Sequence, residues 1–66
     1  MIITVNGEER ELPAGATVAV LADQLLAPAR GVAIAVDGEV VPRGEWPGTP
    51  LEDGARVEVV VAVQGG

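Results

Sequence analysis

The stretch that decides the fold is Arg56-Val57-Glu58-Val59-Val60-Val61-Ala62-Val63, the longest β-type run in the sequence. Alternate side chains of a strand point to opposite faces of its sheet. We expect the helix-facing side of this strand to carry four valines: Val57, Val59, Val61 and Val63. The opposite side begins charged and becomes apolar along the run: Arg56, Glu58, Val60 and Ala62.

Two earlier segments predict β-hairpins. In the first, the β-branched run 2–5 is followed by Asn6-Gly7 and a polar return at 9–12. Asn-Gly and Asp-Gly pairs favour two-residue turns because both positions tolerate positive φ. In the second, residues 32–36 lead through Asp37-Gly38 into residues 39–41. Residues 32–36 are apolar on both faces, which predicts an interior strand.

Between the hairpins, Thr17 is a candidate N-cap for a helix that runs to about Leu26. Its apolar stripe consists of Val18, Leu21, Ala22 and Leu25. Residues 43–52 predict a loop or one helical turn. With the helix across the sheet, the last strand is expected beside the first. The sequence thus predicts an α+β domain with a mixed four- or five-stranded sheet and one main helix. This element order resembles the β-grasp, ubiquitin-like fold.

The composition argues against several classes of function. The 66 residues include no Ser, Cys, His, Lys or Tyr, so the usual nucleophiles and the usual neutral-pH base are missing. An enzyme acting alone is therefore not expected, nor is a bound metal or cofactor. A net charge of −6 disfavours nucleic acid and anionic membrane as partners. With neither a signal peptide nor an apolar span, the expected location is cytoplasmic.

The predicted outward side of the sheet carries small apolar residues. Ile34 and Val36 are expected to point inward, as are Ile3 and Val5 of the first strand. The outward residues form one apolar group: Ala33, Ala35, Val60 and Ala62. They are either scattered surface residues or a docking face that presents the residues beyond Val63 to a partner.

The sequence closes on Gln64, Gly65 and Gly66. We divide it into a domain at 1–63 and a flexible tail at 64–66. A terminal glycine carboxylate has no Cβ beside it, so it can enter a narrow channel in another protein. The alternative is a terminus that only frays.

Several stretches together resemble the small bacterial sulfur carrier proteins of thiamine thiazole biosynthesis. They are 2–7 (Ile-Ile-Thr-Val-Asn-Gly), 36–43 (Val-Asp-Gly-Glu-Val-Val-Pro-Arg), Trp46, 51–58 (Leu-Glu-Asp-Gly-Ala-Arg-Val-Glu) and 62–66 (Ala-Val-Gln-Gly-Gly). The Val-Pro-Arg segment followed by Trp46 and the closing Ala-Val-Gln-Gly-Gly are the most specific of these. The resemblance extends over the whole sequence.

The resemblance implies a chemistry in which the carrier is a co-substrate. A ubiquitin-activating-enzyme-like adenylyltransferase would use ATP to adenylate the Gly66 carboxylate. A cysteine-derived persulfide would supply sulfur for a Gly66 thiocarboxylate, and thiazole synthase would take that sulfur into the thiazole ring. Gly65 and Gln64 would form the arm that carries Gly66. No cofactor would be bound by the carrier itself.

Three alternatives remain open on the sequence alone. The carrier could serve another sulfur pathway, such as molybdopterin or cysteine synthesis. The chain could instead be a ubiquitin-like protein modifier, or an interaction module whose glycines have no chemical role. The family pattern also marks Arg43 and Trp46. The alternative to a functional role is a structural one, in which Trp46 closes one end of the core and Arg43 pairs with a nearby carboxylate.

Overall fold

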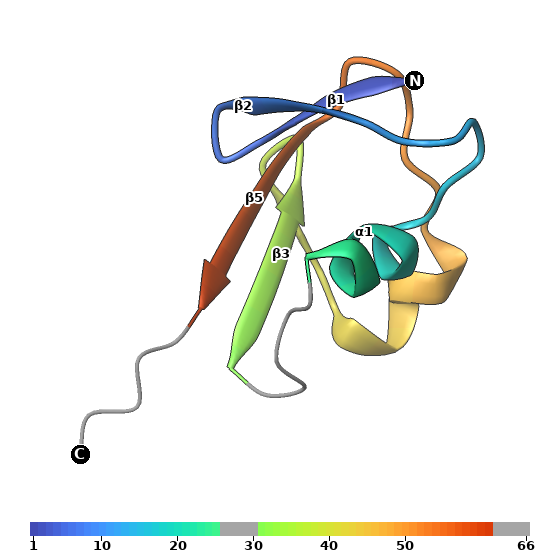
Figure 1. The fold of residues 1–66 in the computed structure, drawn as a ribbon. Coiled ribbons are helices and arrows are strands. Elements are labelled where there is room, and N and C mark those ends of the chain that lie inside the picture. The colour runs from blue at the N-terminus through green and yellow to red at the C-terminus, as the bar shows by residue number, and fades with distance from the viewer. Residues whose placement is uncertain (26–30, 62–66) are drawn as a thin grey trace.

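A mixed sheet with two helical segments on one side makes up the structure, a computed structural model that describes residues 1–25 and 31–61 (Figure 1). The elements, in chain order, are β1 (Ile2–Val5), β2 (Glu8–Glu11), α1 (Val18–Gln24), β3 (Val32–Val36), β4 (Glu39–Val41), the 3₁₀ helix η1 (Arg43–Gly48) and β5 (Arg56–Val61).

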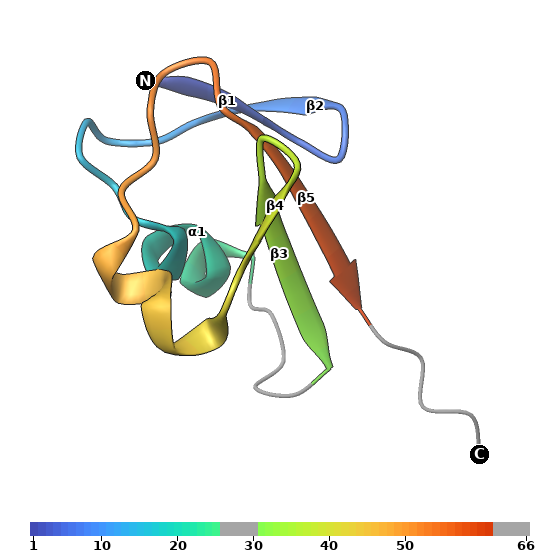
Figure 2. The same cartoon turned by 180° about the vertical axis from the view of Figure 1, so that it is seen from behind.

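The last strand lies in the middle of the sheet, whose order is β2-β1-β5-β3-β4. β5 pairs with β1 in parallel, and every other neighbouring pair is antiparallel. The predictions that the last strand lies beside the first and that residues 32–36 form an interior strand are confirmed. Figure 2, seen from behind, shows β4 beyond β3 at the edge of the sheet.

Both predicted hairpin turns have the expected left-handed backbone. Asn6 and Gly7 have φ of 51° and 85°, and Asp37 and Gly38 have φ of 50° and 88°. Two consecutive positive φ angles are the mark of a type I′ turn, whose twist suits a two-residue hairpin. The first turn pairs Val5 with Glu8.

Helix α1 begins where the sequence predicts. The Thr17 hydroxyl accepts a hydrogen bond from the Val20 backbone N–H at 3.3 Å, so it satisfies one of the free donors of the first turn. The helix ends at Gln24 with Leu25 as its C-cap, and the predicted end at Leu26 lies outside the described residues. The predicted stripe faces the core, with Val18, Leu21 and Ala22 buried and Leu25 half-buried.

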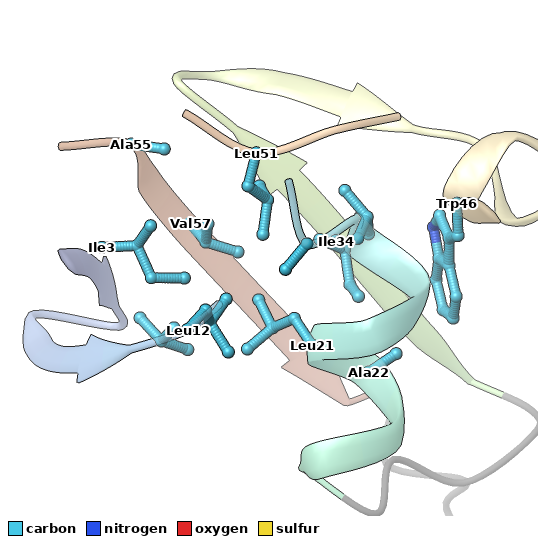
Figure 3. Close-up of a cluster of buried hydrophobic side chains, with 12 residues drawn as sticks. Ile3, Leu12, Leu21, Ala22, Ile34, Trp46, Leu51, Ala55 and Val57 are labelled. Carbon is cyan, nitrogen blue, oxygen red and sulfur yellow. The ribbon is translucent and has the colours of Figure 1, made fainter. Parts of the chain in front are cut away.

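One aliphatic core lies between the sheet and the helical segments. Figure 3 shows Leu21 of α1, Ile34 of β3 and Val57 of β5 pointing into a common cluster. The buried members are Ile3, Val5, Leu12, Ala16, Val18, Leu21, Ala22, Ile34, Trp46, Leu51, Ala55 and Val57. Among the described residues, no buried side-chain nitrogen or oxygen lacks a hydrogen-bond partner.

Trp46 closes one end of this core from η1. Its indole Nε1–H donates to the Val41 carbonyl at 2.8 Å, which satisfies the polar atom of a buried ring. The structural role predicted for Trp46 is confirmed. Where the sequence predicts a carboxylate partner for Arg43, the guanidinium instead lies over the indole ring, 5.5 Å from its centroid. Arg43 thus contacts the outer side of the tryptophan that closes the core.

Candidate functional site

The first half of β5 is held firmly on both edges. On the β1 side, the Thr4 N–H donates at 3.0 Å to the carbonyl of Ala55, just before the strand, and the Asn6 N–H donates to the Val57 carbonyl at 2.9 Å. On the β3 side, Asp37 makes two hydrogen bonds with Arg56. The Asp37 N–H donates to the Arg56 carbonyl at 2.8 Å, and the Asp37 Oδ1 accepts from the Arg56 N–H at 3.0 Å. The next residue, Val57, is fully buried. This half of the strand belongs to the core.

The second half of β5 leaves the core. Val59 is half-buried, whereas Val60 and Val61 are 61% and 52% exposed. The prediction that Val61 packs under the helix is wrong. Alternation places Val61 on the same face as Val57, but the seven-residue α1 is only about 10 Å long and a six-residue strand extends about 20 Å. Val63, the last valine predicted to face the helix, lies outside the described residues.

The outward side of the sheet carries apolar residues that pair across three strands. Ala33 lies opposite Val60, and Ala35 lies between Glu58 on β5 and Val40 on β4. We call Ala33, Ala35, Val40 and Val60 the outer patch. Ala33 and Val60 are exposed, and Ala35 is half-buried. Strand pairing therefore places the predicted outward residues Ala33, Ala35 and Val60 on one surface, and Ala62 lies outside the described residues.

Val40 is the member of the outer patch that the sequence analysis missed, and it is 70% exposed. A signal for it was present. A two-residue turn at Asp37-Gly38 pairs residue 36 with 39, and hence Ala35 with Val40. Residues directly opposite in a sheet share a face, so the outward assignment of Ala35 implies the same for Val40.

The predicted reactive residues Gln64, Gly65 and Gly66 lie outside the described residues. Val61 is the last strand residue before them, and Gly66 follows it by five positions in the sequence. The arrowhead of β5 lies away from the N-terminus and from the β1–β2 hairpin in both views (Figures 1 and 2). β5 therefore leads from the core to the segment that carries the glycines.

In the described part of the chain, the chemistry-bearing residues form no metal site, since no group of three or more Asp or Glu side chains gathers. No helix among residues 1–25 and 31–61 is long and apolar enough to cross a membrane. What the described geometry offers a partner is a strand end and an apolar surface beside it.

Comparison with known proteins decides the family. The sequence profile of the ThiS family matches residues 3–66, which is nearly the whole chain and includes the closing glycines. The chain belongs to the ThiS family. The match confirms the resemblance drawn from the sequence stretches quoted above.

Two curated relatives of this ThiS-family chain have informative names. The sulfur carrier protein ThiS of Escherichia coli K12 is 32% identical over 66 residues, which cover all of both chains. A thiazole synthase of Paramagnetospirillum magneticum is 35% identical over all of this chain, and the chain spans only 20% of that protein's length. The predicted function, a sulfur carrier of thiamine thiazole synthesis that is a co-substrate and not an enzyme, is confirmed at the level of the family.

Solved ThiS structures have the same fold. The crystal structure of the thiamine biosynthesis protein ThiS from Geobacter metallireducens gives a TM-score of 0.83 at 32% identity, covering 100% of this chain and 99% of that one. An NMR structure of a Geobacter metallireducens thiamine biosynthesis protein gives 0.80 at 29% identity, covering 100% and 88%. The predicted β-grasp, ubiquitin-like α+β fold is confirmed, with five strands in the sheet.

Proposed function

We propose that this ThiS-family chain carries sulfur as a thiocarboxylate on Gly66 and delivers it for the thiazole ring of thiamine. The observation that carries the proposal is that the family match extends through residue 66. In this proposal residues 1–63 form the β-grasp domain, and residues 64–66 form an arm with Gly66 as the carboxyl-terminal residue. Gln64 and Gly65 extend Gly66 by about 10 Å when fully stretched.

Activation is needed because a carboxylate is a poor electrophile. A ubiquitin-activating-enzyme-like adenylyltransferase joins the Gly66 carboxylate to the α-phosphorus of ATP, and pyrophosphate leaves. A cysteine-derived persulfide then attacks the acyl carbon, and AMP leaves with one carboxylate oxygen. A thiol then attacks the outer sulfur of the resulting acyl disulfide, so that a new disulfide forms and the Gly66 thiocarboxylate leaves with the electron pair of the broken S–S bond. Every catalytic group belongs to the partners, which agrees with a carrier that has no Cys, His, Lys, Ser or Tyr. The proposed location is the cytoplasm, where ATP is available to the partner.

Thiazole synthase is the proposed acceptor. The support is that a Paramagnetospirillum magneticum protein named thiazole synthase contains a segment 35% identical to this entire chain. In that organism, a protein named thiazole synthase thus includes a carrier-like segment in its own polypeptide chain.

The proposed docking surface for the adenylyltransferase consists of Ala33, Ala35 and Val60 of the outer patch together with Ala62, and it does not include Val40. Val60 and Ala33 are exposed and lie opposite one another, next to Val61 and Val32, the last described pair of β5 and β3. A partner that covers them, together with Ala35 and Ala62, would hold β5 while the arm enters its active site. Small apolar side chains suit such a face because they allow close approach of two surfaces.

The test of the proposal is an intact-mass measurement after incubation with ATP, the cognate adenylyltransferase and a persulfide sulfur source. We expect a shift that corresponds to replacement of one oxygen by sulfur, and its loss on deletion of Gly66. An unchanged mass, with an enzyme that is active on a control carrier, would contradict the proposal. High-mass conjugates in a blot would instead favour the protein-modifier alternative. Addition of thiazole synthase and its substrates should return the carboxylate mass, which identifies the acceptor.

A further inference from the structure

The Asn6 side chain holds β5 at a point that β1 does not reach. Its Oδ1 accepts from the Val59 N–H at 2.9 Å, and its Nδ2 donates to the Val59 carbonyl at 3.1 Å. The two residues are 53 positions apart in the sequence, so this is a tertiary contact and not part of the turn itself. A positive φ at position 6 alone would be met equally well by glycine.

The side-chain amide of Asn6 continues the β1–β5 ladder. The parallel register of β1 with β5 covers Thr4 with Arg56 and Val5 with Val57. The Asn6 backbone N–H adds a bond to the Val57 carbonyl at 2.9 Å, after which the chain turns away into β2. The amide then offers one acceptor and one donor to Val59, as a further strand residue would.

This contact lies at the border between the two halves of β5. As far as Val59, β5 is held on both edges. Asn6 bonds it on the β1 side, and β3 pairs with it on the other side. The β3 register continues to Val61 opposite Val32, whereas among the described residues the β1-side hydrogen bonds extend no farther than Val59. Asn6 is therefore the last β1-side anchor, among the described residues, before the segment that carries Gly66.

We propose that Asn6 is a positioning residue for activation. Its amide fixes the direction in which β5 leaves the sheet, and so keeps the arm aligned for entry into the adenylyltransferase. The inference rests on the proposed function, because it assigns Asn6 a part in presenting Gly66 to the activating partner. Without the amide, the end of β5 is held on the β3 side alone and samples directions that the partner does not accept.

The chain contains a matched control for this inference. Asp37 occupies the same turn position as Asn6, with φ of 50° against 51°, and each is followed by glycine. Its Oδ1 also accepts from a β5 N–H, that of Arg56, at 3.0 Å. Arg56 is the first residue of β5, whereas Val59 lies three residues nearer the arm. Asn6→Gly therefore removes two side-chain hydrogen bonds at Val59, in the second half of β5, and Asp37→Gly removes one at Arg56, the first residue of the strand.

The first measurement needs no partner. Amide hydrogen exchange followed by NMR should show faster exchange at Val59 in Asn6→Gly and at Arg56 in Asp37→Gly, with urea denaturation confirming that both variants remain folded. Unchanged exchange at Val59 in Asn6→Gly would overturn the inference, because the amide would then not hold the strand.

The second measurement is the steady-state rate of adenylation by the cognate adenylyltransferase. The rate is monitored by ATP–pyrophosphate exchange while the carrier concentration is varied. Asn6→Gly should raise KM for the carrier about three- to tenfold, if the aligned fraction falls to about a third to a tenth, and leave kcat within about twofold. Asp37→Gly should leave both constants near wild type. Equal KM values for wild type and Asn6→Gly, or equal increases in both variants, would overturn the positioning role alone. Failure of the wild-type chain to be activated would overturn the proposed function and the inference with it.

Discussion

The two halves of β5 differ in almost every physical respect although both are rich in valine. Val57 is fully buried, and the backbone beside it is bonded on both edges. Val60 and Val61 are more than half exposed, and the last β1-side anchor in the described part of the strand is the Asn6 side-chain amide. One half of the strand belongs to the core, and in the proposed function the other half presents the arm to the partner. If that proposal holds, stability and delivery are separated along a single strand.

Valine serves both halves for different reasons. In the first half its apolar side chain fills the core between the sheet and α1. In the second half, where Val60 and Val61 face solvent, its branched Cβ still favours extended backbone through restricted χ1 and strand preference. A strand of this kind can stay straight beyond the cover of the helix. An exposed valine pair also offers apolar area to a partner.

The largest expected effect comes from placing the same charge in each half. Val57→Asp buries a carboxylate whose neutralisation costs about 4 kcal/mol at pH 7, and it also removes a buried valine worth about 2 kcal/mol. A domain of this size is stable by about 3 to 10 kcal/mol, so this variant should lose most or all of its free energy of unfolding. Val61→Asp should cost less than about 1 kcal/mol, since the site is solvated.

Circular dichroism with urea denaturation checks this pair of variants. Similar stability losses in both would mean that Val61 is as enclosed as Val57, and the contrast between the two halves would fail.

The next effect lies in the arm and leaves the domain untouched. Gly66→Ala should lower the rate of adenylation by at least about tenfold, which is about 1.4 kcal/mol in the barrier, because a Cβ crowds the carboxylate under reaction. Thermal stability should match that of wild type, since position 66 lies beyond the last described strand residue. The pyrophosphate release rate is the measurement. A variant that is activated at the wild-type rate would contradict the steric explanation.

Much of the fold could be predicted because its decisive signals are local. The Asn6-Gly7 and Asp37-Gly38 turns and the Thr17 cap depend on neighbours within a few residues, and the structure confirms all three. Alternation assigns a face to each β5 residue, but it does not say how far the helix covers that face. That is why Val61 was predicted to be inward and is exposed.

The site was less accessible to sequence reasoning for a related reason. The Asn6 amide meets Val59 only after the chain has brought together positions 53 residues apart. The residue type at position 6 is fully accounted for by its turn, so the sequence gives no sign of a second role. Gly66 could be proposed from the sequence because its chemistry depends on the residue itself and not on its neighbours in space.

A smaller effect, on the KM for the adenylyltransferase, should distinguish Val60 on β5 from Val40 on β4, at the other side of the outer patch. Val60→Asp should raise the KM of the carrier for the adenylyltransferase about tenfold, because an apolar contact is replaced by a charge that must be desolvated on docking. Val40→Asp is the matched variant. Val40 is 70% exposed on the edge strand β4, which β3 separates from β5, so the KM of Val40→Asp should change less than threefold if docking follows the second half of β5. Equal effects would extend the docking surface across the sheet, and no effect from Val60→Asp would remove the surface altogether.

The smallest effect should come from a bond next to the first half of β5, at a place where delivery is not involved. The Asp53 Oδ1 accepts from the Ile2 N–H at 2.7 Å, and the Gly54 N–H donates to the Ile2 carbonyl at 2.7 Å, which ties the turn before β5 to the start of β1. Asp53→Ala should lower the free energy of unfolding by about 1 kcal/mol through loss of one hydrogen bond, with Glu52→Ala as the control for removing an exposed charge. Urea denaturation measures both variants. Adenylation of the Asp53→Ala protein should proceed with wild-type KM. The lost bond lies next to the first half of β5, which is hydrogen-bonded on both edges. A raised KM would show that weakening the attachment before β5 also affects presentation of the arm. The two halves of the strand would then not be independent.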